Sequence, residues 1–215
     1  ADDNGKFTLA EDGTLTFATA PDFEAPGSAK GSNAYKVNIK ATDDAGNVTS
    51  KAITVNVTDV NEAPTAVALS SSSSTLSELA DTTKTSTATK LADISITDDA
   101  LGANTITLTG ADKDKFEVVG KALYLKAGVT LDYEANAAHQ YQVSVNVQDN
   151  TVTGSSAVST NYTLNLTNVN EAPTANGTVD AVTAVTGTAI ADIDLSTKFA
   201  DVDAGDTRTY ALKDG

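Results

Sequence analysis

The sequence predicts an all-β protein built from tandem β-sandwiches. Short runs alternate apolar with polar side chains, as in residues 35–40 and 53–58. A period of two places one face of a strand in a core and the other face in water. The runs are rich in Val, Ile and Thr, and Gly- and Asp-containing breaks separate them. Regularly spaced short strands over about 100 residues are typical of a β-sandwich.

The expected strands form pairs that recur along the chain. They cover residues 35–40, 53–58, 141–147 and 162–166. The segment Asp44-Ala45-Gly46-Asn47 is expected to be a hairpin turn between the first two strands. The serine run 70–74 is expected to be a flexible loop, and His139, the single histidine, an ordinary surface residue. No long stretch has helical spacing.

Two motifs recur at one long period. The segment 58–65, Thr-Asp-Val-Asn-Glu-Ala-Pro-Thr, returns 109 residues later as Thr-Asn-Val-Asn-Glu-Ala-Pro-Thr at 167–174. The triplet Asp22-Phe23-Glu24 returns 110 residues later as Asp132-Tyr133-Glu134. Self-similarity at a fixed period is typical of stacked domains. The period predicts three parts: 1–64, the C-terminal part of one repeat; 65–173, a complete repeat; and 174–215, the N-terminal part of another.

The chain is therefore expected to begin and end inside repeats. When residues 212–215 are placed directly before residues 1–7, the joined segment resembles residues 108–116 of the middle repeat. Two interpretations follow: a segment cut from an array at an arbitrary point, or two halves that complement each other within one chain or between neighbours. The N-terminus has no basic start followed by an apolar core, so an interior slice of a larger exported chain is expected.

Composition narrows the function classes. The 215 residues include 29 acidic and 14 basic side chains, for a net charge of −15. Such a charge repels nucleic acid and anionic membranes and favours cations. Without Cys or Met and with one His, the chain has no disulfides, thiolate chemistry or usual transition-metal ligands. No apolar run approaches the roughly 20 residues of a membrane span.

The order of the acidic motifs resembles that of cadherin repeats, in the form found in large calcium-dependent surface adhesins of Gram-negative bacteria. Leu76-Ser77-Glu78 resembles the glutamate near the first strand, and the two Asp-x-Glu triplets resemble the motif after the middle strands. The segment 59–64 resembles the cadherin linker, and Asp98-Asp99 the Asp-x-Asp element of the next repeat. The segment 199–206 is more similar to the dystroglycan-type cadherin variant.

The resemblance implies tandem Ig-like or cadherin-like Greek-key β-sandwiches with Ca²⁺ at the linkers. The implied ligands are Asp22, Glu24, Asp59, Val60, Asn61, Glu62, Ala63, Asp98, Asp99, Asp149, Glu78, Asp132, Glu134, Asn168, Asn170, Glu171, Asp201 and Asp203. Calcium takes six to eight oxygens from carboxylates, amides and carbonyls. Because Asn168 stands where Asp59 stands in the first linker, the second site is expected to bind calcium less tightly.

Two function classes remain open. The first is a calcium-stiffened array of an extracellular adhesin, at the cell surface or secreted, whose partners are neighbouring repeats. The alternative is a carbohydrate-binding or self-associating module of a secreted polysaccharide-active protein, which engages cell-surface polysaccharide or like repeats on other molecules. An exposed aromatic platform would favour that alternative, and the sequence does not reveal one. Catalysis is not expected, because no aromatic cleft accompanies the carboxylate pair Asp132 and Glu134.

Overall fold

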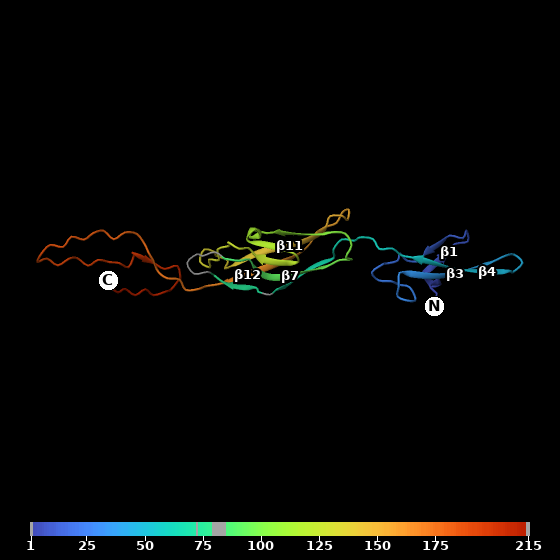
Figure 1. Ribbon diagram of the computed structural model, residues 1–215, viewed down its shortest axis with the longest axis horizontal. Helices are drawn as coiled ribbons and strands as arrows, with labels where there is room; N and C mark the ends of the chain where they lie inside the picture. Colours follow the sequence, from blue (N-terminus) through green and yellow to red (C-terminus); the bar gives the residue numbers. More distant parts are fainter. Residues whose placement is uncertain (1, 72, 79–84, 214–215) are drawn as a thin grey trace. The chain divides into compact units, whose positions relative to one another are not determined.

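The computed structural model describes residues 2–71, 73–78 and 85–213, and it confirms the all-β prediction. The chain divides into two compact units. Unit 1 contains Ala1–Ala63 together with the loop segments Asp98–Ala103 and Thr151–Thr153. Unit 2 contains Pro64–Thr97, Asn104–Asn150 and Gly154–Gly215. Figure 1 labels β1, β3 and β4 in unit 1 and β7, β11 and β12 in unit 2.

Unit 1 consists of two antiparallel hairpins. Its elements are η1 (Asn4–Lys6), β1 (Phe7–Leu9), β2 (Leu15–Phe17), β3 (Ala34–Thr42) and β4 (Val48–Asn56). Phe17 links the hairpins, because its ring lies 4.3 Å from Phe7 and 5.1 Å from the buried Tyr35 ring. The turn at 44–47 joins β3 to β4 as predicted. Gly46 has a φ of +81° there, which a glycine adopts without a steric cost.

Unit 2 contains a sandwich of two four-stranded sheets. One sheet has the order β5-β7-β10-β9 and the other β6-β12-β11-β8. The strands are β5 (Ala66–Ser71), β6 (Thr75–Ser77), β7 (Thr89–Thr97), β8 (Asn104–Thr109), β9 (Phe116–Val119), β10 (Ala122–Leu125), β11 (Gln140–Asp149) and β12 (Val158–Thr167), with the short helix η3 (Lys113–Lys115) before β9. Only β6 and β12 pair in parallel among the described strands.

The core of unit 2 lies between the two sheets. Leu91, Leu123 and Leu125 from the first sheet pack with Val145 and Leu164 from the second, and all are 0% exposed. Alternation along each strand therefore sends one face inward, as the period of two predicts. The other face of each sheet meets solvent.

After the second linker, the chain forms little regular structure. β13 (Thr174–Ala175) pairs with β14 (Phe199–Ala200), and residues 176–198 contain no strand. Apolar side chains of this part are exposed, among them Val185 at 66% and Ile190 at 55%.

One side-chain to backbone hydrogen bond of the strands recurs at matching positions of the two units. The buried Asp3 accepts the Lys36 N–H through Oδ2 at 2.7 Å, and Asp112 accepts the Gln142 N–H through Oδ2 at 2.9 Å. The residue before each donor is a buried tyrosine, at 35 and at 141. The alignment of the two repeats therefore extends to individual contacts.

Two local predictions need correction. Ser70 and Ser71 end β5 and do not belong to a loop, while Ser72 lies outside the described residues. His139 is half-buried and stacks on Tyr133, with ring centroids 3.7 Å apart. It has a φ of +51°, and its Nδ1 lies 2.9 Å from the Tyr133 carbonyl. These two contacts hold His139 against the loop that carries Glu134.

Candidate metal centre

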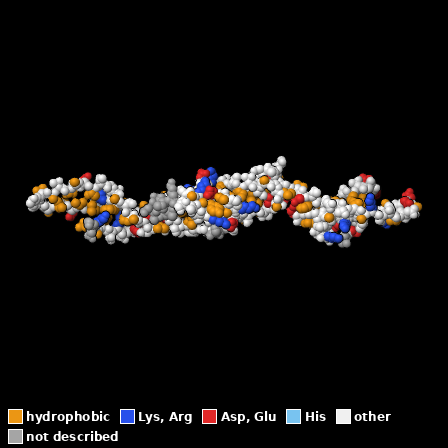
Figure 2. All heavy atoms as spheres, in the orientation of Figure 1, with side chains coloured by type: hydrophobic (Ala, Val, Ile, Leu, Met, Phe, Trp, Pro, Cys, Tyr) orange, Lys and Arg blue, Asp and Glu red, His pale blue; other side chains and the backbone are white. Residues whose placement is uncertain are grey.

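Three groups of carboxylates gather within the described residues. Cluster 1 is Glu24, Asp59 and Glu62; cluster 2 is Glu78, Glu134 and Glu171; cluster 3 is Asp201, Asp203 and Asp206. In each cluster, one oxygen from every member lies within 4.8 Å of the others. Figure 2 shows acidic side chains gathered in small groups on a surface that is largely uncharged.

Cluster 1 is assembled by two loops that follow strands. Asp22 Oδ1 accepts the backbone N–H of Glu24 at 3.0 Å, and this turn positions Glu24 after β2. Asp59 and Glu62 follow β4. Asp99, from a loop segment of the same unit, accepts the Glu62 N–H through Oδ2 at 2.8 Å.

In cluster 1, each negative charge makes ionisation of the neighbouring carboxyl groups less favourable. Desolvation raises the pKa of Glu24, and the charges of Asp59 and Asp22 raise it further. Desolvation also raises the pKa of Glu62, with contributions from Glu24, Asp99 and Asp59. Asp59 Oδ1 is covered from solvent without a hydrogen-bond partner among the described residues. Like charges this close disfavour one another's ionised form, and a bound cation would offset that repulsion.

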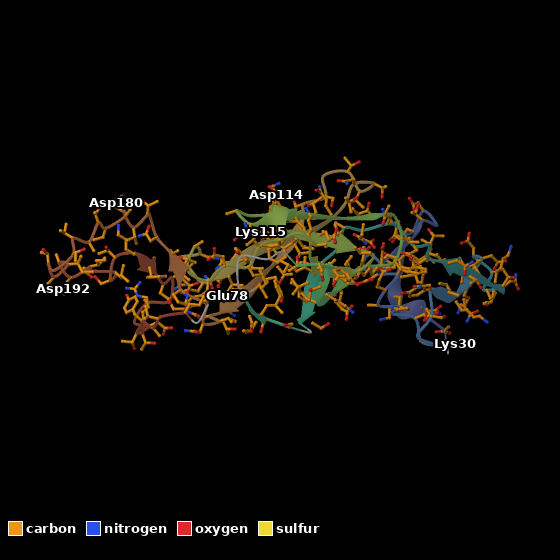
Figure 3. The ribbon with its side chains drawn as sticks, turned by 60° about the vertical axis from the view of Figure 1, so that its left-hand side comes forward. Lys30, Glu78, Asp114, Lys115, Asp180 and Asp192 are labelled. Atoms are coloured by element: carbon orange, nitrogen blue, oxygen red, sulfur yellow. The ribbon has the colours of Figure 1, made fainter. Side chains whose placement is uncertain are left out.

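Glu78 is the centre of cluster 2. It follows β6 and is only 4% exposed. Its Oε1 accepts the Val169 N–H at 2.8 Å, and its Oε2 accepts the Tyr133 N–H at 2.6 Å. One buried carboxylate thus joins the end of β6, the Asp-x-Glu loop and the second linker, and Figure 3 labels it.

The other members of cluster 2 come from the two segments that Glu78 holds. Asn168 donates through Nδ2 to Glu134 Oε1 at 2.8 Å. Glu171 donates its backbone N–H to Asp203 Oδ2 at 2.7 Å. The contact to Asp203, which is 9% exposed, brings cluster 3 next to cluster 2.

Glu171 shows the largest electrostatic effect of the site. Desolvation, followed by the charges of Glu78, Asp203 and Glu134, raises its pKa to about 7. Desolvation also raises the pKa of Glu134, and Glu78 and Asp203 add to this shift. Glu171 Oε2 is covered and has no hydrogen-bond partner among the described residues. A bound cation would reverse the sign of these interactions.

Cluster 3 contains a ligand candidate that sequence reasoning missed. Asp201 Oδ1 accepts the Asp203 N–H at 3.1 Å, in a turn that sets the pair. Asp206 joins them, and Asn170 donates to it through Nδ2. The signal in the sequence for Asp206 is the glycine that precedes it. Gly205 has a φ of +98°, and this conformation reverses the chain so that Asp206 approaches Asp201 and Asp203.

The two linkers use the same contact. Glu62 donates to Asp99 as Glu171 donates to Asp203, so Asp99 and Asp203 occupy equivalent positions. Asn61 donates through Nδ2 to Thr151 Oγ1 at 2.8 Å, where Asn170 donates to Asp206.

Several predicted ligands lie outside the three clusters. Asp132 Oδ1 accepts the Ala135 N–H at 2.7 Å, so its role resembles that of Asp22 as a turn former. Asp149 belongs to unit 2, where it is fully buried at the end of β11. Val60, at 66% exposure, and Ala63 offer only backbone oxygen. Asp98 precedes Asp99 in its loop and is not a cluster member.

Comparison with known proteins places the fold. The sequence matches no protein-family model and no curated protein. Solved cadherin ectodomains are similar in structure. A protocadherin gammaB7 EC3-6 cis-dimer structure aligns over 81% of this chain and 39% of its own, with 21% identity and a TM-score of 0.55. The protocadherin gammaB4 extracellular domain aligns over 76% and 25%, with 21% identity and a TM-score of 0.55. Drosophila N-cadherin EC1-4 aligns over 79% and 39%, with 19% identity and a TM-score of 0.50.

The fold is therefore that of cadherin-like β-sandwich repeats, as the motif order predicted. This chain spans less than half the length of the protocadherin chains above. Within the described residues, no helix is long and apolar enough to cross a bilayer.

Proposed function

We propose that this chain is a calcium-binding segment of an extracellular adhesin of bacterial type. Its repeats would be 1–64, 65–173 and 174–215, with calcium held where each repeat meets the next. Its role would be structural and adhesive, not catalytic, at a cell surface or on a secreted protein. Neighbouring repeats of the same array would be its immediate partners, and like repeats on other molecules would extend the adhesion.

One observation carries this proposal: carboxylate clusters recur at both linkers with the same internal contact. Each cluster offers only oxygen, and Asp59 Oδ1 and Glu171 Oε2 are covered without a partner among the described residues. Calcium prefers a set of hard oxygen donors, and its charge would offset the mutual repulsion that raises the pKa of these carboxyl groups. These residues therefore fit a calcium ion.

The residues that would hold calcium follow from the clusters. At the first linker they are Glu24, Asp59 and Glu62, with Asp99 beside them. At the second linker they are Glu78, Glu134, Glu171, Asp201, Asp203 and Asp206. Although Asn168 replaces Asp59, Glu78 adds a buried carboxylate to the second cluster. The weaker calcium binding expected at the second linker from Asn168 stays a prediction, and titration of the cluster variants would measure it.

Calcium would also set the stiffness of each linker. Without the ion, neighbouring carboxylates repel and the segments that carry them separate; with it, the same oxygens converge. Pro64 and Pro173 restrict the backbone after each Asn-Glu-Ala motif.

Scattering during a calcium titration tests this function. We expect the radius of gyration and maximum dimension of the chain to change on calcium addition and to return on chelation. The variant Glu171→Gln should shift the midpoint to higher calcium, whereas Glu117→Gln, on β9 and outside the clusters, should not. Identical scattering curves with calcium and with chelator would overturn the stiffening role.

A further inference from the structure

The solvent face of the sheet β6-β12-β11-β8 carries no charged side chain. Alternation along the four strands identifies the outward-facing residues. They are Thr75 and Ser77 on β6; Ser159, Asn161, Thr163, Asn165 and Thr167 on β12; Gln140, Gln142, Ser144, Asn146 and Gln148 on β11; and Thr105, Thr107 and Thr109 on β8. We call this surface the amide–hydroxyl face.

The opposite sheet of the sandwich does not share this uncharged character. The outward residues of the opposite sheet include Lys90 and Asp93 on β7, which form an ion pair of 2.7 Å, and Glu117 on β9. One fifth of the whole chain is charged, and the net charge is −15. A broad sheet face without charge is therefore a distinct surface of this protein.

The groups of the face are arranged in rows across the strands. Thr109, Ser144 and Asn161 are in register, and so are Thr107, Asn146 and Ser159 in the next row. Neighbours in the rows hold one another: Ser144 donates to Asn161 Oδ1, and Asn146 Nδ2 donates to Thr109 Oγ1 at 3.0 Å. These bonds orient the side chains before any ligand arrives.

A groove of about 370 Å³ opens at one end of the face. Its lining includes Gly110, Asp112, Gln142, Ser144, Asn161 and Thr163. The Asn161 Nδ2 and the Gln142 side-chain amide have no hydrogen-bond partner among the described residues. Two side-chain amides and the Thr163 hydroxyl therefore remain available in a concave site.

We propose that the amide–hydroxyl face binds an uncharged polysaccharide, with the groove at Gln142 and Asn161 as its principal subsite. Sugar hydroxyls both donate and accept hydrogen bonds, and so do the side-chain amides and hydroxyls of this face. A neutral chain meets no repulsion from the net charge of −15, whereas an anionic polymer does. Recognition uses hydrogen bonds in place of an aromatic platform.

The same features argue against a protein partner on this face. Protein interfaces concentrate aromatic and apolar side chains at a desolvated core, and the outward residues of this face are all small or amide-bearing. Each site is expected to bind weakly, so an array of repeats along one polysaccharide would supply avidity.

Affinity electrophoresis tests the proposal with the whole chain. Native gels contain dextran, mannan, xylan or a soluble β-glucan as neutral probes and alginate as the anionic probe, all at one calcium concentration. We expect at least one neutral polymer to retard the protein and alginate not to. Asn161→Ala and Gln142→Ala should each weaken binding about fivefold, the usual effect of losing one hydrogen bond.

The matched control is Ser95→Ala, an exposed residue of β7 in the opposite sheet, which should bind as the wild type does. Both target side chains are exposed, and thermal melting would verify that the variants are folded. The proposal is overturned if no neutral polymer retards the chain, if alginate alone does, or if the target variants bind like the control. Concentration-dependent self-association that Asn161→Ala abolishes would assign the face to a second copy and would also overturn it.

Discussion

The substitution Glu78→Ala should uncouple three segments of the second linker at once. Glu78 is 4% exposed and accepts two backbone N–H groups, from Val169 and from Tyr133. Each N–H left without its acceptor costs roughly 1–3 kcal/mol, so the free energy of unfolding should fall by about 2–6 kcal/mol in chelator. Relief of repulsion with Glu134 and Glu171 offsets part of this loss.

The variant Glu78→Gln separates the two effects. Its amide keeps one acceptor and removes the charge, so its loss in chelator should be smaller than that of Glu78→Ala. In calcium both variants should bind the ion roughly 10–100-fold more weakly, the usual cost of disturbing groups that orient a metal site. The loss of stability should therefore be greater in calcium than in chelator.

Urea unfolding monitored by circular dichroism, with and without calcium, measures all of these quantities. The matched control is Glu117→Ala on β9, which should change stability by less than about 0.5 kcal/mol. The role given to Glu78 would be refuted if Glu78→Ala were as stable as the wild type in chelator. It would also be refuted if the variant lost the same free energy of unfolding with calcium as without it.

Three further predictions follow from the site and the core. In chelator the folded chain should lose stability as the pH rises from about 4.5 to about 7. The reason is that Glu171 has a pKa of about 7 in the folded chain against the ordinary 4.5, so the folded state binds more protons than the unfolded state in that window. Melting temperatures at pH 5 and pH 7.5 measure this, and a higher melting temperature at pH 7.5 would contradict it. Asp59→Ala should weaken calcium binding at cluster 1 while the chain stays folded, because Asp59 follows β4 and lies outside the core. Calorimetry measures the binding and circular dichroism measures the fold, and an unfolded variant would contradict the prediction. Tyr141→Ala should lower the free energy of unfolding by about 3–5 kcal/mol and leave the number of bound calcium ions unchanged, because the ring is only 7% exposed inside the sandwich. Urea unfolding measures this loss, and a loss below about 1 kcal/mol would contradict the prediction.

Sequence periodicity predicted the fold because burial follows the alternation of side chains directly. The strands around Tyr141 and Tyr162 occur where the period of two placed them, and their apolar faces form the core. The prediction of a loop at Ser70 and Ser71 was wrong because composition alone does not report backbone pairing. Ser70 and Ser71 pair with β7 through their main-chain groups, which every residue except proline carries in full.

The candidate site was predictable in composition but not in detail. Glu24, Asp59 and Glu62 converge as the motif order implied, because the loop after β2 and the segment after β4 come together. Asp22 and Asp132 instead accept turn N–H groups, since a short Asp side chain reaches its own backbone first. Asp206 was missed because its approach depends on the reversal at Gly205.

Thermal unfolding of the unmodified chain in chelator and in about 10 mM calcium tests the central claim most directly. With dissociation constants of about 10⁻⁴–10⁻³ M, usual for extracellular modules, each occupied site should add about 1.4–2.7 kcal/mol to the stability of the folded state. Calorimetry under the same conditions should show heat of calcium binding. An unchanged melting temperature together with no calcium heat would contradict the assignment of the clusters as calcium sites.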